Sequence, residues 1–230
     1  LLDHVDAATT GALILIDKPS GWTSFDVVAR LRTILRIRRI GHCGTLDPMA
    51  TGLLQVCVGR ATKLVETFQA GLKEYVGHFR LGGTTPSDDA ETEVTQSLPI
   101  DHLTREIVET AAKTFLGTID QIPPMYSARK VDGTRLYKIA RRGETIERPS
   151  RSVDIHEFEI GDVRLPDVAF RVVCSRGTYI RSLVRDLGTA VGSGAYLTEL
   201  RRTKSGSYRV DDAATLEALG ERSHGREDRR

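Results

Sequence analysis

Apolar residues in continuous runs or in alternation predict strands in five segments, which are residues 12–16, 53–58, 73–81, 152–160 and 168–174. The run 53–58 is apolar throughout and is typical of a strand buried on both faces. The segment 73–81 alternates instead, which places Tyr75, Gly77, Phe79 and Leu81 on one face.

Apolar residues three or four positions apart predict helices in residues 27–35, 61–68, 104–116, 134–142 and 180–187, and in a short stretch from Asp212. We expect Thr23 or Ser24 to cap the first helix, Thr104 the third and Thr178 the fifth. The polar segment 82–95 is expected to be a mobile loop. Strands and helices thus occur along the whole chain.

The candidate chemistry lies in residues 41–54, which read GHCGTLDPMATGLL. Three glycines in this stretch permit close approach of the backbone to a ligand. Pro48 disfavours the α region for Asp47 and is suited to a first helical position, so Asp47 is expected to cap a helical turn. A capped loop alone requires neither His42 nor three glycines. A P-loop is excluded because no Gly-Lys-Ser/Thr follows the glycines.

This stretch closely resembles the catalytic loop GHxGTLDPxATG of the tRNA pseudouridine-55 synthases, the TruB family. Further motifs of that family resemble KPSGWTSFDVV, KEYVG, QIPPMYSARKVDGTRLYKIARRG, CSRGTYIRSL and GSGAYLTELRR, so the resemblance covers about residues 11–210. It implies the pseudouridine synthase fold. That is an α+β fold with a large mixed, mostly antiparallel sheet, flanking helices and a central catalytic cleft.

The resemblance also implies roles for single residues. Asp47 would be the nucleophile and Arg181 its partner; independently, an arginine in the first turn of a helix opposes the helix dipole and suggests a nearby carboxylate. The other residues would surround the target uridine. Tyr75 and Leu200 would sandwich the base, and Tyr75 would also belong to the catalytic residues. His42 would fill the vacated space or hold the RNA. Tyr179 would bound the pocket, and Lys18 would help build its floor.

The implied function is isomerisation of one uridine, position 55 in the T-arm of tRNA, to pseudouridine. The base must leave its stack to reach Asp47, and an ionised carboxylate can attack either C1′ or C6, a choice that the sequence leaves open. No cofactor and no metal are implied. The expected partner is the T-arm stem-loop, and the protein is expected to be a monomer.

Composition agrees with an RNA-modifying enzyme of the cytoplasm. The chain of 230 residues has 40% hydrophobic and 28% charged residues, with no candidate membrane span or signal pattern. Three cysteines without CxxC spacing indicate neither a disulfide framework nor a zinc site, and the paired Asp88 and Asp89 lack further metal-ligand spacing. The net charge is only +2, but basic residues cluster in three places that could contact RNA phosphates. They are Arg36, Arg38 and Arg39; Arg129, Lys130, Arg135, Lys138, Arg141 and Arg142; and Arg201, Arg202 and Lys204.

We expect one catalytic domain over residues 11–210, followed by a short helix and a partly disordered tail over 211–230. Many members of the resembled family carry a further C-terminal RNA-binding domain, for which this chain has no room, so we expect either a short form or a truncated chain, with weaker T-arm affinity. Two other functions rank far lower. A non-catalytic RNA-binding or RNA-folding protein would not depend on Asp47, and a retaining glycosidase requires a second carboxylate that these motifs lack.

Overall fold

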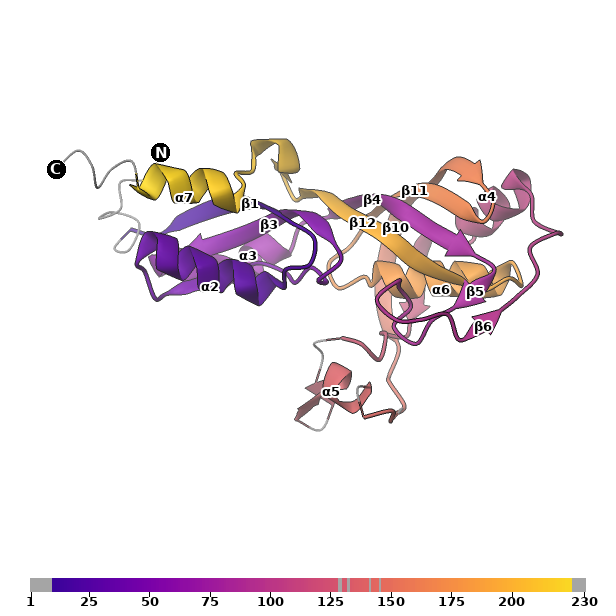
Figure 1. The fold of residues 1–230 in the computed structure, drawn as a ribbon. Coiled ribbons are helices and arrows are strands. Elements are labelled where there is room, and N and C mark those ends of the chain that lie inside the picture. The colour runs from indigo at the N-terminus through magenta and orange to yellow at the C-terminus, as the bar shows by residue number, and fades with distance from the viewer. Residues whose placement is uncertain (1–9, 128–129, 132, 141, 145, 225–230) are drawn as a thin grey trace. The chain divides into compact units, whose positions relative to one another are not determined.

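The structure is a computed structural model that describes residues 10–127, 130–131, 133–140, 142–144 and 146–224. The chain divides into two compact units (Figure 1), each of which is described by itself. Unit 1 comprises Leu1–Tyr75 and Leu200–Arg230, and unit 2 comprises Val76–Glu199. The expected single catalytic domain over 11–210 stays a prediction. The end of the expected disordered tail, beyond residue 224, lies outside the described residues.

Unit 1 is built around strand β3 (Thr51–Val58). This strand pairs antiparallel with β1 (Ala12–Lys18) and β2 (Ile40–His42), and parallel with β12 (Ala195–Ser205). The short strand β13 (Tyr208–Arg209) follows β12 and pairs with it antiparallel. Every residue of β3 after Thr51 is buried, which confirms the strand predicted from its continuous apolar run.

The helices of unit 1 pack on this sheet. Helix α2 (Ser24–Leu35) begins at a capping box, in which Thr23 Oγ1 accepts from the Asp26 N–H and the Asp26 carboxylate accepts from the Thr23 N–H. It contacts β2 and also α7 (Leu216–His224), which comes from the far end of the sequence (Figure 1). Unit 1 also contains the 3₁₀-helices η1 (Gly59–Leu64) and η2 (Val210–Asp212) and the helix α3 (Val65–Gln69).

The helix predicted over 61–68 is confirmed as a helical segment, but it is divided into two pieces. The segment forms the 3₁₀-helix η1 and then the one-turn helix α3, and neither has a side chain that caps its first turn. Gly59 adopts a φ of +60°, so the chain enters this segment through a backbone conformation that disfavours a regular α-helical start.

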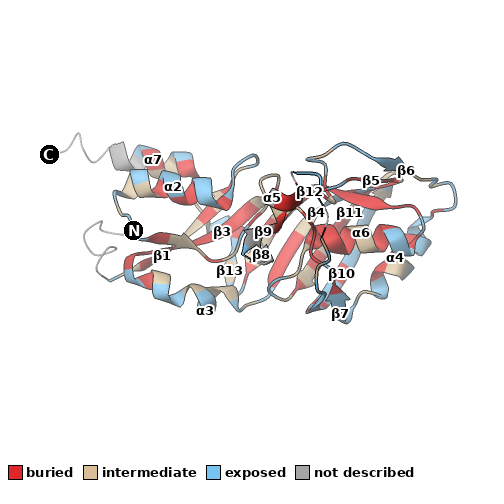
Figure 2. Cartoon of the chain, turned by 90° about the horizontal axis from the view of Figure 1, so that it is seen from below, coloured by how far each residue is buried: buried red, intermediate tan, exposed pale blue. Residues whose placement is uncertain are grey.

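Unit 2 contains strands in the order β12, β4 (Lys73–Leu81), β11 (Asp167–Cys174), β10 (Arg151–Arg164) and β7 (Gly117–Gln121). β10 pairs antiparallel with both β11 and β7. Figure 2 shows buried residues along β4 and β11. Three aromatic rings, from β4, β10 and β11, meet in this core. The Phe170 ring centroid lies 5.8 Å from that of Phe79 and 6.2 Å from that of Phe158. The one-faced packing predicted for β4 is confirmed for Tyr75, Phe79 and Leu81, which are all buried.

The remaining elements of unit 2 are short. Helix α4 (Arg105–Lys113), capped by Thr104 as predicted, contacts β10 and α6 (Ile180–Ala190). Two small hairpins pair β5 (Gly83–Thr84) with β6 (Gln96–Ser97), and β8 (Lys130–Val131) with β9 (Thr134–Arg135). The predicted helix 134–142 is shorter than expected, because its first two residues belong to β9 and the helix α5 is Leu136–Ala140. Its buried residues form a small core with Met125.

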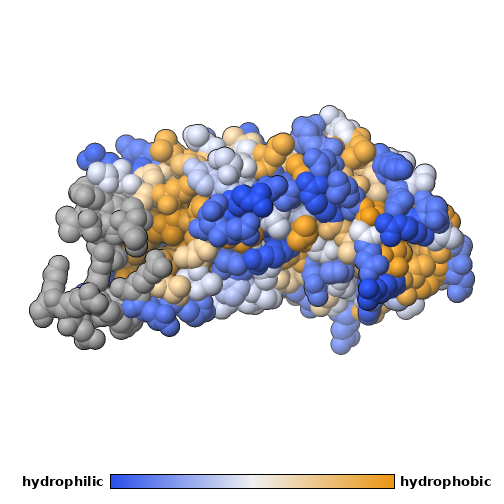
Figure 3. Space-filling model, turned by 90° about the horizontal axis from the view of Figure 1, so that it is seen from above, coloured by the Kyte–Doolittle hydropathy of each residue, from blue (hydrophilic) through white to orange (hydrophobic). Residues whose placement is uncertain are grey.

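The α+β class and the mixed, mostly antiparallel sheet are confirmed, since the β3–β12 pair is parallel and β1, β2, β7 and β10 make antiparallel pairs. In the part of the chain that the structure describes, no helix is long and apolar enough to cross a membrane. Hydrophilic side chains interleave with smaller hydrophobic patches on the face drawn in Figure 3.

Candidate active site

Asp47 lies in the loop that connects β2 to β3 in unit 1. The Ala50 N–H donates to the Asp47 carbonyl over 3.1 Å, which closes a single turn around Pro48 and Met49. The expected helical turn after Asp47 was wrong, because β3 begins at Thr51 and leaves too few residues for a helix. Asp47 is half-buried.

The buried side chain of Lys18 binds this loop. Its ammonium group donates to the carbonyl oxygens of Pro19 at 2.9 Å, Trp22 at 2.6 Å and Pro48 at 3.1 Å. These three acceptors match the three N–H donors of a lysine, and the side chain is fully buried. The Gly21 N–H also donates to the Pro48 carbonyl, at 2.9 Å. The turn after β1 is therefore tied to the residue next to Asp47.

Ser24, the first residue of α2, holds the residue on the other side of Asp47. Its Oγ accepts from the Leu46 N–H at 2.9 Å and donates to the Leu46 carbonyl at 3.2 Å. Ser20 Oγ donates to the Met49 carbonyl at 3.3 Å. Hydrogen bonds thus anchor the backbone before and after Asp47, so the loop presents its carboxylate from a defined position.

Arg202 supports the same loop from β12. Its Nε donates to the Leu53 carbonyl at 2.7 Å and its Nη2 to the Gly44 carbonyl at 3.4 Å, and only 2% of the residue is exposed. β12 comes so close to β3 that a Cβ at Gly52, where φ is +97°, would lie 2.3 Å from the Arg202 carbonyl oxygen. The glycine is therefore required for this contact between strands.

Within the third basic cluster, a phosphate contact by Arg202 is contradicted by its burial, whereas contacts by Arg201 and Lys204 stay predictions. Arg202 is buried, Arg201 forms a two-pronged pair with Asp17 at 2.9 and 2.7 Å, and Lys204 pairs with Glu74 at 3.1 Å. These charges are compensated within unit 1.

His42, Tyr75 and Leu200 also belong to unit 1. His42 is the last residue of β2, and its buried Nδ1 meets no hydrogen-bond partner among the described residues. Burial, together with the positive charge of Arg202, lowers the pKa of His42 from its ordinary value, which favours the neutral form of the imidazole. Tyr75 and Leu200 are buried, at 8% and 7% exposure. Their expected places around a base stay predictions.

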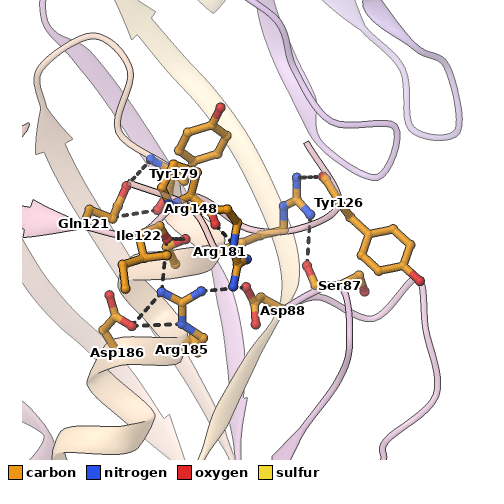
Figure 4. A network of polar contacts seen from close by, with 12 residues as sticks. Ser87, Asp88, Gln121, Ile122, Tyr126, Arg148, Tyr179, Arg181, Arg185 and Asp186 are labelled. Atoms are coloured by element: carbon orange, nitrogen blue, oxygen red, sulfur yellow. Dashed lines mark hydrogen bonds and ion pairs between the residues drawn. The ribbon is translucent and has the colours of Figure 1, made fainter. Parts of the chain in front are cut away.

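Arg181 belongs to unit 2, in the first turn of α6 (Figure 4). Its Nη1 donates to the Ser87 carbonyl and its Nη2 to the Tyr126 carbonyl, both at 2.9 Å. Nη1 also lies 3.4 Å from Oδ2 of Asp89, and both side chains are almost fully buried. The carboxylate expected near this arginine is therefore present as Asp89. Pairing of Arg181 with Asp47 stays a prediction.

Tyr179 is the N-cap residue of α6 and is held by Gln121. Its N–H donates to Gln121 Oε1 at 2.7 Å, and Gln121 Nε2 donates to its carbonyl at 3.0 Å (Figure 4). The predicted Thr178 cap was wrong, because the Thr178 hydroxyl donates to the Ser175 carbonyl at 3.0 Å instead. The amide of Gln121 replaces it and fixes the backbone at the start of the helix.

The polar segment 82–95 was predicted to be a mobile loop, but it contains buried polar residues that are held by hydrogen bonds. Ser87 Oγ donates to Asp89 Oδ1 at 2.5 Å, and Asp88 accepts from Arg185 Nη1 at 3.1 Å. Burial raises the pKa of Asp88, an effect that Arg185 opposes. Both aspartates therefore bind arginines. Among the described residues, no three His, Cys, Asp or Glu side chains are grouped as a metal site.

Sequence reasoning missed Arg202, Asp89 and Gln121 as supports of these residues. Only Arg202 had a usable signal: it lies two positions after Leu200 in a strand, so it shares the face of a residue expected to be buried. Asp89 and Gln121 contact partners that are distant in sequence, which no local pattern reveals.

Comparison with known proteins agrees with these observations. The model of the "TruB family pseudouridylate synthase (N terminal domain)" matches residues 32–180, and that of the "tRNA pseudouridylate synthase B C-terminal domain" matches residues 181–229. The tRNA pseudouridine synthase B of Flavobacterium johnsoniae is 51% identical over 90% of this chain and 93% of its own length. That of Thermobifida fusca is 50% identical over 90% of this chain and 73% of its own length.

A solved structure with a similar fold is that of a Cbf5-Nop10-Gar1 complex, with a TM-score of 0.76 and 31% identity. The match covers 99% of this chain and spans 59% of that one. The H/ACA RNP bound to a substrate RNA containing 2′-deoxyuridine gives a TM-score of 0.73 and 30% identity, over 99% and 58% of the two chains. From the family model and the identity of about one half over most of its length, the chain belongs to the TruB family of pseudouridylate synthases.

Proposed function

We propose that this protein isomerises a uridine of tRNA to pseudouridine, with Asp47 as the nucleophile. Relatives named tRNA pseudouridine synthase B, which are 48–51% identical over about nine-tenths of the chain, support the substrate. The observation that carries the role of Asp47 is the anchored loop. Leu46, Pro48 and Met49 are each held by hydrogen bonds, so the carboxylate between them is presented without a reorganisation of its backbone.

The reaction rearranges atoms that the uridine already contains. The bond between N1 and C1′ breaks, the base turns, and a new bond forms between C5 and C1′. The proton on C5 is lost and N1 gains one, so substrate and product are isomers and the balance requires no group donor or redox partner. The carboxylate of Asp47 attacks either C1′ or C6 and is regenerated at the end.

The finer assignment is that the target is position 55 in the T-arm. The base leaves its stack to reach Asp47, at a cost of a few kcal/mol that contacts in the pocket offset. Tyr75 and Leu200 sandwich the base, and His42 fills the space that it vacates or holds the RNA. Tyr179 bounds the pocket, Lys18 lies in its floor, and Arg181 is the partner of Asp47. The protein acts as a monomer in the cytoplasm. These assignments rest on the matched motifs.

The test is single-turnover conversion of unmodified tRNA by Asp47→Asn, with the product mapped to its position. Because an amide of the same shape is a poor nucleophile, we expect the rate to fall by about 10⁴-fold or more, while the dissociation constant for tRNA changes little. Asp212→Asn, which removes an exposed carboxylate of the same unit, is the matched control and should convert tRNA like the wild type. Conversion by Asp47→Asn at a rate near that of the wild type would refute the assignment.

A further inference from the structure

An open groove of about 630 Å³ lies on unit 1, beside the start of the loop that carries Asp47. Its walls come from α2, from the segment that joins α2 to β2, from β2 itself and from the start of the helical segment after β3. Its lining includes an aromatic ring, three arginines and two further polar side chains, which are Phe25, Arg32, Arg38, Arg39, His42 and Thr62.

Three arginines give the groove a positive charge that no carboxylate compensates among the described residues. Arg32 is fixed in place, since its Nε donates to the Arg38 carbonyl at 3.1 Å and its Nη2 to the Ile40 carbonyl at 3.2 Å. Arg39 Nε donates to Thr62 Oγ1 at 2.7 Å. A guanidinium group carries five N–H donors, so each of these side chains keeps donors for a ligand. Arg38 and Arg39 are exposed.

An exposed aromatic ring completes the lining. Phe25 is 64% exposed, and the Arg32 guanidinium carbon lies 5.9 Å from its ring centroid. An open ring next to fixed guanidinium groups is the combination that binds single-stranded or looped RNA, where bases or riboses stack while arginines bind the phosphates. Because the groove is open, it suits a strand that passes across it more than an enclosed small molecule.

The position of the groove decides which RNA it would bind. Gly41 and His42 line it, and these are the first two residues of the GHCGTLDP stretch. They lie six and five positions before Asp47. A strand in the groove would therefore lead directly to the loop that presents the nucleophile.

We infer that this groove binds the sugar–phosphate backbone of the RNA substrate, with Arg38 and Arg39 as phosphate contacts, Arg32 as a fixed positive charge and Phe25 as a stacking surface. The inference rests on the proposed function for the identity of the RNA. It distinguishes Arg38 and Arg39 of the first basic cluster, which line an open groove, from the third cluster, whose members are paired with carboxylates or buried.

The test compares Arg38→Gln/Arg39→Gln with Arg30→Gln/Lys63→Gln by filter binding of unmodified tRNA over a range of salt concentrations. Both double variants remove two positive charges from exposed residues of unit 1, but Arg30 and Lys63 do not line the groove. For the groove variant we expect the dissociation constant to rise by about tenfold or more at 0.1 M salt. The log–log salt slope should become smaller in magnitude by about 1.4–1.8, which is 0.7–0.9 for each of two phosphate contacts. The control variant should stay within about twofold of the wild type, since it removes charge without removing contacts.

Arg38→Gln alone provides a second variant in case loss of the Arg39–Thr62 hydrogen bond impairs folding, and about half of the slope change is expected for it. Equal binding by the groove and control variants would overturn the inference, and so would an equal loss by both. Conversion of tRNA by the wild type is measured in parallel. If the wild type converts tRNA and the groove variant binds like the control, the inference about the groove fails while the proposed function stands. If the wild type binds tRNA through the groove but forms no pseudouridine, the proposed function fails alone.

Discussion

Lys18 and Arg202 bury their cationic groups beside the loop that carries Asp47, and both bind backbone carbonyl oxygens there. Burial of a charge is costly unless hydrogen bonds replace the water that is lost. The carbonyls of Gly44, Pro48 and Leu53 supply such bonds, and the two cations in turn keep these backbone positions fixed.

We expect Arg202→Met to lower the free energy of unfolding by about 1.5–3 kcal/mol, because it removes charge-assisted hydrogen bonds and leaves buried carbonyls without them. The measurement is urea-induced unfolding. The neighbouring Arg201→Met is the control, since it breaks a partly exposed ion pair with Asp17 and should cost about 0.2–1 kcal/mol. Equal losses for the two variants would mean that Arg202 has no special role beneath the loop.

At the scale of elements, unit 1 depends on the parallel contact between β3 and β12. The pair is short, with Arg201 opposite Thr51 and Arg202 opposite Gly52. The close approach at Gly52 is what brings the Arg202 side chain to the Leu53 carbonyl. A change that separates the strands therefore also removes the support of the loop.

Gly52→Ala should lower the free energy of unfolding by about 2–5 kcal/mol, as the sum of the left-handed backbone cost and of overpacking against the Arg202 backbone. Gly41→Ala is the matched control from the same stretch, because a Cβ there would meet no atom within 4 Å. Thermal and urea unfolding of both variants provide the comparison. If Gly52→Ala proves as stable as Gly41→Ala, the close contact with β12 is not required for folding.

The elements that could be predicted from the sequence are those in which the local spacing of apolar or capping residues indicates the structure. β3 follows from its continuous apolar run, β4 from its alternation, and the start of α2 from Thr23, since each of these signals arises within a few residues. The candidate Asp47 came from the motif that surrounds it. Such signals require no knowledge of which distant segments pack together.

The parts that could not be predicted depend on contacts between distant residues. Gln121 holds Tyr179 from 58 positions away, and Arg202 reaches Leu53 across 149 positions. The pattern of a strand does not show whether a basic residue faces solvent or carbonyl oxygens, which is why the buried Arg202 was predicted to contact RNA. Part of the middle basic cluster, Arg129 and Arg141, lies outside the described residues, while Arg142 pairs with Glu144 at 2.8 Å.

At the scale of the whole molecule, all three cysteines are buried and reduced, Cys43 and Cys57 in unit 1 and Cys174 in unit 2. The sulfur atoms of Cys43 and Cys57 lie 3.2 Å apart. Burial, together with the neighbouring Cys57, raises the pKa of Cys43 to about 12. The reactive species is the thiolate, so Cys43 combines poor access with a very small reactive fraction, while Cys57 and Cys174 are protected by burial.

We therefore expect no fast reaction of the native protein with a thiol reagent such as 5,5′-dithiobis(2-nitrobenzoic acid) at pH 8, where only about one Cys43 in 10⁴ is a thiolate. In denaturant, all three thiols should react at the rate of a small free thiol, which serves as the control. Rapid modification of one thiol in the native protein would show that the interior around it opens readily.

The division of unit 1 between the two ends of the sequence has a consequence for synthesis on the ribosome. The residues of β12 that pair with β3, Arg201 and Arg202, are translated only after the 124 residues of Val76–Glu199, and so is the helix α7. At about 5–20 residues per second this is a delay of about 6–25 s. Unit 2, which is continuous in sequence, is complete before then. During that interval the nascent chain carries β3 without its parallel neighbour and α2 without α7, and the loop of Asp47 acquires its Arg202 support only when β12 emerges.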